Sequence, residues 1–179
     1  MNVFISGGCK NGKSSYAQKL ALKLHSGRQL YYIATMKPVD DEDQNRIKRH
    51  IAERKGLGFE TIEIFQDIHK LVDIADPKSL LLIDATTSLL ANEMFKGSEV
   101  FSSAGKHITM GYDAVFSAFN DVIIVSDYIY ASSQRYGEYT EIYRENLALI
   151  DRFCAKKCDA VIETVCGNYI AYKGEIDCA

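Results

Sequence analysis

Long hydrophobic runs are missing from this chain of 179 residues. It contains no stretch of roughly 18 consecutive apolar residues, the length that a membrane-spanning helix needs. It also has no basic segment that leads into a short apolar one, the pattern of a secretory signal. We therefore expect no membrane insertion and a cytoplasmic location.

A large excess of charge of one sign is missing too. The formal net charge is -3 at pH 7. Proteins that bind nucleic acid or anionic membrane over a broad surface are usually basic. We therefore expect small-molecule partners and no nucleic acid.

Cysteine occurs five times, an odd number that lacks the spacing of a disulfide scaffold. We expect these thiols to be reduced. Two of them, four residues apart in a predicted helix, would share one helix face, but no second pair of ligands accompanies them, so a zinc site there is not expected. The cysteines are Cys9, Cys154, Cys158, Cys166 and Cys178, and the pair is Cys154 and Cys158.

Internal repeats, low-complexity tracts and interdomain linkers are also absent, which predicts a single domain over residues 1–179. Apolar runs typical of strands alternate with helical patterns. This alternation predicts an α/β fold, with a mainly parallel sheet flanked by helices and a short C-terminal antiparallel hairpin. Strands are expected at 3–5, 30–35, 61–65, 79–84, 121–127, 159–165 and 169–172, and helices at 16–26, 40–54, 68–74, 88–96, 111–120 and 139–156.

Two polar segments separate some of these elements. Residues 96–105 are expected to form a flexible loop. Residues 128–139 are rich in tyrosine. A mobile loop over a ligand and an aromatic contact between subunits both fit this composition.

The most informative motif follows the first apolar run. It reads Gly7-x-x-x-x-Gly12-Lys13-Ser14 and leads into a helical pattern, the context of a phosphate-binding P-loop. Glycines let successive backbone N–H groups and the helix N-terminus converge on phosphate oxygens. Lys13 would reach the β- and γ-phosphates, and the Ser14 hydroxyl would hold Mg²⁺. A glycine-rich turn capped by Ser14 is the alternative.

A carboxylate stands at the end of another apolar run, Ser79-Leu-Leu-Leu-Ile-Asp84. In a P-loop fold, a strand buried on both faces delivers such a carboxylate beside Mg²⁺. We expect Asp84 to take this role. An ordinary cap of the next helix is the alternative.

A charged helix is predicted over residues 40–54, because the segment begins acidic and ends basic. Arg46, His50 and Arg54 are each four residues apart, which places them along one helix face. Either this face is a solvated charged surface, or it presents to a ligand two arginines and a histidine that is cationic when protonated.

These motifs together resemble the bifunctional adenosylcobinamide kinase and adenosylcobinamide-phosphate guanylyltransferase family of cobalamin biosynthesis. That family has a P-loop fold related to that of RecA and usually assembles as a trimer, so the resemblance implies a homo-oligomer. The matching segments appear in the family's order: Gly7-Gly8-x-x-x-Gly12-Lys13-Ser14, Tyr32-Ile33-Ala34-Thr35, Asp40-Asp41-Glu42, Arg46-Ile47-x-x-His50, Arg54, and Leu81-Leu82-Ile83-Asp84 with Thr87 and Asn92.

The resemblance implies two reactions with nucleotide and corrinoid substrates. Family members phosphorylate the aminopropanol hydroxyl of the corrinoid with ATP or GTP and then transfer GMP from GTP through a covalent GMP-histidine. His50 matches the guanylylated histidine, and Lys13 and Asp84 match the residues of phosphoryl transfer. The implied Mg²⁺ ligands are Ser14 and Asp84, and the implied nucleotide-binding residues are Gly7, Gly8, Cys9, Lys10, Asn11, Gly12, Lys13, Ser14, Thr35, Arg46 and Arg54.

Two features depart from the family pattern. The acid that ends the run before the Mg²⁺ site is Glu in the family and Asp84 here. After Val125 the family carries Asn-Glu-Val-Gly and then Gly-Ile-Val-Pro, whereas this chain has Ser126-Asp127-Tyr128 and lacks the glycine and the proline. Two alternatives therefore stay open. One is a P-loop kinase of another small molecule, and the other is a paralogue that binds nucleotide without full bifunctional activity.

Overall fold

The structure, a computed structural model, describes residues 1–97 and 99–176. Within these residues a seven-stranded sheet has the order β3-β2-β4-β7-β1-β8-β9, and every neighbouring pair is parallel except β8 and β9. The strands of this sheet are β1 (Val3–Gly7), β2 (Leu30–Ala34), β3 (Phe59–Glu63), β4 (Leu80–Asp84), β7 (Asp121–Asp127), β8 (Ala160–Val165) and β9 (Asn168–Lys173). The predicted fold class is therefore confirmed.

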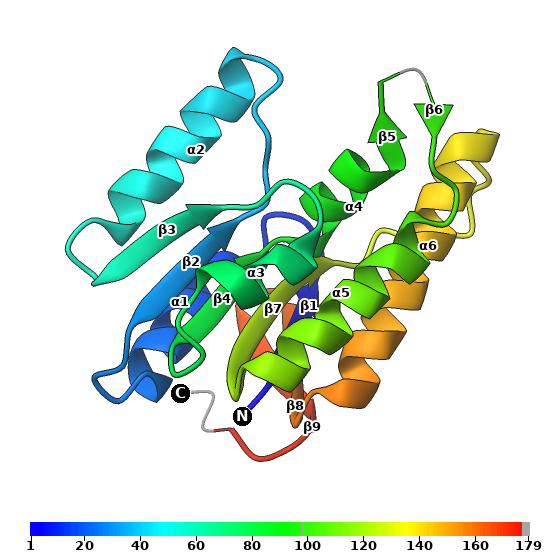
Figure 1. Cartoon of the computed structure of the whole chain (residues 1–179). Coiled ribbons are helices and arrows are strands. Elements are labelled where there is room, and N and C mark those ends of the chain that lie inside the picture. The colour runs from blue at the N-terminus through cyan, green and yellow to red at the C-terminus, as the bar shows by residue number, and fades with distance from the viewer. Residues whose placement is uncertain (98, 177–179) are drawn as a thin grey trace.

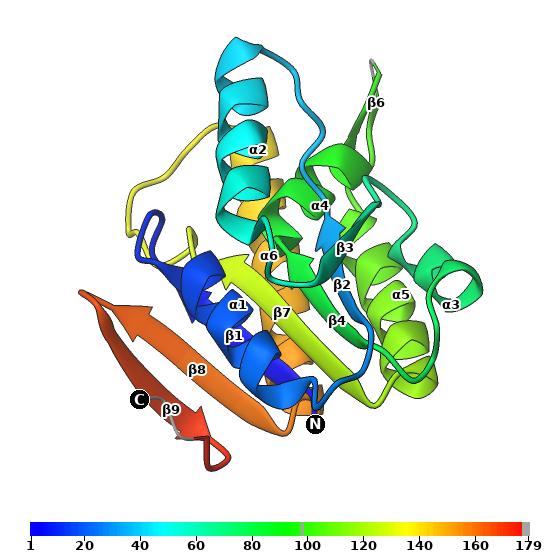
Figure 2. The same ribbon diagram turned by 90° about the vertical axis from the view of Figure 1, so that its left-hand side faces the viewer.

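Helices cover both faces of the sheet (Figure 1). Turned by 90°, the molecule shows α1 in front of the sheet and α4, α5 and α6 behind it (Figure 2). The helical elements are α1 (Lys13–Leu24), α2 (Asp41–Arg54), the 3-10 helix η1 (Ile68–Lys70), α3 (Leu71–Ile74), α4 (Thr86–Met94), α5 (Ala104–Ala118) and α6 (Glu138–Lys157).

The central strands are buried on both sides because successive side chains of a strand point to opposite faces. In β4, Leu80 and Leu82 pack in the cluster with α1, whereas Leu81 and Ile83 pack in the cluster with α4, α5 and α6. All four side chains are fully buried. This double burial explains why the strand is a continuous apolar run rather than an alternating one.

Helix α2 stands apart from the two helical layers, above the carboxyl ends of β2 and β3 in both views (Figures 1 and 2). Asp40 caps its N-terminus by accepting a hydrogen bond from the backbone N–H of Asp43 at 2.8 Å. Acidic residues fill its first turn and Arg54 lies in its last, as the helix dipole favours. Among its residues only Arg54 is buried, so α2 is held by few apolar contacts.

Two predictions near residue 100 were wrong. Residues 96–105, predicted as a flexible loop, include a short hairpin of β5 (Phe95–Lys96) and β6 (Glu99–Val100), although residue 98 itself lies outside the described residues. The helix expected at 111–120 begins at Ala104 instead. Its first turn packs on α6, where the side chain of Asn146 accepts a hydrogen bond from the N–H of Gly105 at 2.7 Å. This long-range contact has no counterpart in the local sequence pattern.

Smaller differences concern element ends. The strand predicted at 61–65 spans Phe59–Glu63, and the helix predicted at 88–96 spans Thr86–Met94. The four described cysteines are free, and Cys178 lies outside the described residues. In residues 1–97 and 99–176, no helix is both long and apolar enough to cross a membrane.

Candidate functional site

The loop between β1 and α1 has the backbone that its glycines predict. Gly12 has φ 82°, in the left-handed region, and directly precedes α1. Gly7 lies against β8, where an added Cβ would stand 2.3 Å from Oγ1 of Thr164. Asn11 fastens the loop to the same strand by donating from Nδ2 to the carbonyl of Thr164 at 3.3 Å. Gly8 is half-buried, and Cys9 and Lys10 are exposed.

Lys13 begins α1 and is buried at 5% exposure. Its ammonium group donates to the carbonyl of Gly8 at 2.6 Å and lies 2.5 Å from Oδ1 of Asp127. Asp127 ends β7 and is the register partner of Gly7 on β1. Its second oxygen, Oδ2, accepts a hydrogen bond from the Thr87 hydroxyl at 3.2 Å. Asp127 thus joins the P-loop lysine to the start of α4.

Sequence reasoning left Asp127 out of the site. The available signal was the apolar run of β7 that ends in an acid, the same pattern that singled out Asp84. The strand order decides its position, because β7 lies directly between β4 and β1. Its carboxylate therefore reaches Lys13.

Asp84 ends β4 and belongs to a three-residue cluster. Its Oδ2 accepts a hydrogen bond from the Tyr32 hydroxyl at 2.8 Å. The guanidinium carbon of Arg54 lies 3.4 Å from the centre of the Tyr32 ring, a cation–π contact that links α2 to the sheet. Burial and the neighbouring Asp84 carboxylate raise the pKa of Tyr32 far above its ordinary value. The tyrosine therefore remains a hydrogen-bond donor to Asp84.

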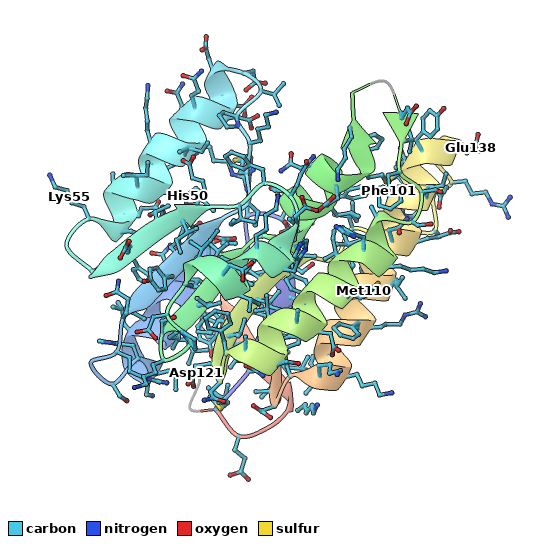
Figure 3. All side chains as sticks on the ribbon, in the orientation of Figure 1. His50, Lys55, Phe101, Met110, Asp121 and Glu138 are labelled. Carbon is cyan, nitrogen blue, oxygen red and sulfur yellow. The ribbon has the colours of Figure 1, made fainter. Side chains whose placement is uncertain are left out.

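One pocket brings five of the predicted site residues together, whereas Lys13 and residues 7–12 do not line it. It is lined by Ser14 of α1, by Asp84 at the end of β4, and by Arg46, His50 and Arg54 of α2. His50 lies on the side of α2 that faces the sheet (Figure 3). The row of Arg46, His50 and Arg54 thus lines a pocket, which favours the ligand-binding interpretation over that of a purely solvated surface. Tyr32, Ala34, Met36, Ile47, Glu63, Ala85, Thr87 and Ser88 complete the lining.

Two nitrogens at this pocket are buried without a hydrogen-bond partner among the described residues: Nδ1 of His50 and Nη1 of Arg54. Nδ1 lies 3.2 Å from Oε2 of Glu53, but the two atoms are not aligned as a hydrogen bond. An unpaired guanidinium N–H costs free energy when it is buried. An anionic ligand in the pocket would supply the missing acceptor.

Thr35, another predicted binding residue, also lies outside this pocket. It is fully buried, and its hydroxyl donates to the carbonyl of Ala85 at 2.7 Å while accepting from the Ala85 N–H at 2.8 Å. Its own carbonyl accepts from Nδ2 of Asn92 at 2.8 Å. Thr35 therefore holds the segment after Asp84 in place, and it does not line the pocket.

Comparisons with known proteins identify the family of this chain. The family model described as cobinamide kinase / cobinamide phosphate guanyltransferase matches residues 3–171. The chain belongs to this family. The resemblance inferred from the motifs is thereby confirmed, and the matched range includes the P-loop, α2, Asp84 and Asp127.

Two relatives in the cobinamide kinase / cobinamide phosphate guanyltransferase family cover the chain to different extents. The bifunctional adenosylcobalamin biosynthesis protein CobP of Pseudomonas aeruginosa is 27% identical over 175 residues, which are 98% of this chain and 99% of that protein. The protein CobU of Escherichia coli K12, with the same description, is 32% identical over 99 residues, which are 53% of this chain and 51% of that protein. The chain spans about half the length of the latter.

Solved structures share the fold at low sequence identity. The flagellar accessory protein FlaH of Methanocaldococcus jannaschii has a TM-score of 0.51 at 15% identity and covers 97% of this chain and 78% of that one. A KaiC-like protein of Pyrococcus horikoshii has a TM-score of 0.54 at 14% identity, and the match covers 90% of this chain and 71% of that one. These likenesses show the fold alone.

Proposed function

We propose that this chain phosphorylates adenosylcobinamide with ATP or GTP and then transfers GMP from GTP to adenosylcobinamide phosphate. The observation that carries the proposal is the single pocket in which the P-loop serine and Asp84 face the His50 row of α2. Phosphoryl transfer requires the first set of groups, and nucleotidyl transfer through histidine requires the second. The family description and the word "bifunctional" in the relatives' names support the same pair of reactions.

In the kinase reaction, the P-loop would bind the nucleotide phosphates and Lys13 would neutralise charge on the transferred phosphoryl group. Asp127 would hold the ammonium group of Lys13 in place, since the two lie 2.5 Å apart. Ser14 and Asp84 offer a hydroxyl and a carboxylate at one pocket, and oxygen ligands of this kind suit Mg²⁺. When bound there, Mg²⁺ would stabilise negative charge on the phosphates.

In the guanylyl transfer, a ring nitrogen of His50 would attack the α-phosphorus of GTP. An N–P bond forms, the bond to the β-phosphate oxygen breaks, and pyrophosphate leaves. A phosphate oxygen of the corrinoid then takes GMP from the histidine. Arg46 and Arg54 flank His50 at one-turn spacing and would balance the charge that develops on the phosphate. The unpaired Nη1 of Arg54 supports this role.

The test is a product assay with purified protein, Mg²⁺ and γ-labelled ATP or GTP, with and without adenosylcobinamide. We expect label to pass to the corrinoid, and Lys13→Ala to reduce this transfer by ~10²-fold or more. Lys19→Ala is the matched control, because Lys19 is exposed on the same helix. A second assay supplies adenosylcobinamide phosphate and α-labelled GTP, and we expect labelled GMP on the corrinoid.

Each other outcome would overturn the proposal. Label on a different small alcohol, with none on the corrinoid, would identify a kinase of another substrate. Nucleotide binding without turnover in either assay would identify a paralogue without bifunctional activity. Wild-type turnover by Lys13→Ala would remove the assignment of the P-loop.

A further inference from the structure

A second cluster of chemically reactive side chains lies on the α5 side of the sheet, away from the P-loop pocket. Asp67 precedes η1, His69 lies within it, and His107 lies in α5. Their possible ligand atoms are all within 4.8 Å of one another. Figure 1 shows η1 and α3 beside α5. None of these residues lines the pocket that holds His50.

The packing of η1 on α5 brings the cluster together. Gly111 lies one turn after His107 on α5, and therefore on the same helix face. An added Cβ at Gly111 would stand 2.6 Å from Cγ2 of Ile68, so the glycine permits this close approach. Ile68 is fully buried there, and its chain neighbours are Asp67 and His69. Core packing thus fixes the backbone beside Asp67 and His69 against α5.

Two carboxylates, those of Asp67 and Glu93, lie near His107, and each also contacts a lysine. Nε2 of His107 lies 3.0 Å from Oδ1 of Asp67 and 3.7 Å from Oε1 of Glu93. The lysines contact the other oxygen of each carboxylate: Nζ of Lys70 lies 3.0 Å from Oδ2 of Asp67, and Nζ of Lys96 lies 2.6 Å from Oε2 of Glu93. Each carboxylate thus has one oxygen near the imidazole nitrogen and the other near a lysine.

Glu93 is the supporting residue of this cluster. Its carboxylate is completely buried, and Oε1 accepts a hydrogen bond from the backbone N–H of Asp67 at 2.5 Å. Buried carboxylates that hold a ligand-bearing segment are a common feature around metal sites, because they orient the ligands. Glu93 thereby fixes the backbone from which Asp67 extends.

We propose that Asp67, His69 and His107 bind a divalent transition-metal ion, such as zinc, with one coordination position left open. Two imidazoles and a carboxylate form a ligand set that zinc accepts, whereas Mg²⁺ and Ca²⁺ prefer oxygen alone. Zinc holds nitrogen at roughly 2.0 to 2.1 Å, so tetrahedral ligand atoms lie about 3.3 to 3.5 Å apart. His69 is exposed, and rotation of its side chain can close the remaining separation.

Histidine variants provide the test, because the chain contains only four histidines: His25, His50, His69 and His107. Zinc is titrated into the full chain against a competing chelator, with Mg²⁺ in excess to occupy oxygen-only sites. We expect one tightly bound zinc per chain, and a loss of affinity of about 100-fold in His69→Ala and in His107→Ala. His25→Ala and His50→Ala serve as matched controls and should bind as the wild type does.

Two further measurements separate this site from other zinc-binding groups. The absorption spectrum of the Co²⁺-loaded protein should show low-coordinate nitrogen and oxygen ligation without a thiolate charge-transfer band. Zinc should raise the thermal midpoint of the wild type but not that of His69→Ala, whose exposed side chain is not needed for folding. Unchanged zinc affinity in both His69→Ala and His107→Ala, a thiolate band, or loss in His50→Ala alone would overturn the proposal.

Discussion

At the scale of single residues, the hydrogen bond from Tyr32 positions the Asp84 carboxylate, the group that we propose as a ligand of Mg²⁺. The Tyr32 hydroxyl donates a hydrogen bond to Asp84 at 2.8 Å, and the Tyr32 ring makes a cation–π contact with the guanidinium of Arg54. Removal of the hydroxyl alone would free the carboxylate and keep the ring contact. The hydrogen bond to Asp84 and the cation–π contact with Arg54 can therefore be tested separately.

We predict that Tyr32→Phe lowers kinase turnover by about tenfold and leaves the fold intact, since one hydrogen bond contributes about 1 kcal/mol to stability. The measurement is phosphoryl transfer at saturating nucleotide, together with urea unfolding. Tyr31→Phe is the matched control, because Tyr31 is the neighbouring residue of β2 and does not line the pocket. Wild-type turnover by Tyr32→Phe would show that the hydrogen bond does not position Asp84 for the reaction.

A second residue-scale prediction concerns Asp151 of α6, which is 3% exposed. Burial raises the pKa of its carboxyl from 3.8 to about 7, although the hydroxyls of Ser126 and Tyr130 donate to it. The native state therefore binds this proton more tightly than the unfolded state does. The free energy of unfolding should therefore fall as pH rises from about 4 to 7 and then level off. This group alone should account for a fall of about 2 to 4 kcal/mol.

Urea unfolding of the wild type and Asp151→Asn at pH 5 and pH 8 measures this effect. The variant should gain stability relative to the wild type at the higher pH, because asparagine cannot ionise. Asp73→Asn is the control, since Asp73 is exposed. An equal difference between Asp151→Asn and wild type at both pH values would contradict the assignment.

The sequence predicted those site residues that belong to local motifs. Each motif lies within a segment of about 15 residues or fewer. These motifs are the P-loop, the apolar run that ends in Asp84, and the row of Arg46, His50 and Arg54. The contacts of Asp127 with Lys13 and of Tyr32 with Asp84 were not predicted. They depend on which strands are neighbours in the sheet, and strand order is a property of tertiary packing.

At the scale of elements, the strands were easier to predict than the helix starts. A strand buried on both faces needs a continuous apolar run, so β4 and β7 are visible in the sequence. The start of α5 is not, because its first turn contains Gly105 and is held by Asn146 of α6. Glycine is a poor helix former, so Gly105 does not indicate a helix in the sequence, and only the close packing on Asn146 explains it.

We predict that Gly105→Ala lowers the free energy of unfolding by about 1 to 3 kcal/mol, the usual cost of overpacking. An added Cβ would stand 2.5 Å from Oδ1 and 3.1 Å from Cα of Asn146, so α5 and α6 would have to separate. Gly137→Ala is the control, because Gly137 has φ -64° and no neighbouring atom within 4 Å of an added Cβ. Equal stability of the two variants would contradict the close packing of α5 on α6.

At the scale of the whole molecule, we predict a homo-oligomer. The resemblance described above implies a trimer, the usual assembly of that family. Large apolar side chains are exposed near the β5–β6 hairpin and the start of α6: Phe95, Phe101, Tyr136 and Tyr139. Figure 3 shows Phe101 and Glu138 at the same end of the molecule. Exposed aromatic side chains favour burial between subunits. Light scattering at micromolar concentration tests this, and a monomeric mass would contradict it.

The central claim is that one pocket serves two reactions, and the adduct on His50 tests it most directly. A simple kinase moves the γ-phosphoryl group straight to its acceptor, whereas nucleotidyl transfer through histidine leaves GMP on the protein. His50 is half-buried on a charged helix, so its replacement should leave the fold and P-loop binding intact. The adduct can therefore be removed without removing nucleotide binding.

The measurement is covalent labelling of the protein by α-labelled GTP with Mg²⁺, followed by mapping of the labelled residue. We predict a label that is labile in acid and stable in base, as a phosphoramidate should be. The label should be absent from His50→Ala and unchanged in the His25→Ala control, while both variants still bind nucleotide. Full labelling of His50→Ala, or no label on the wild type at saturating GTP, would contradict the account.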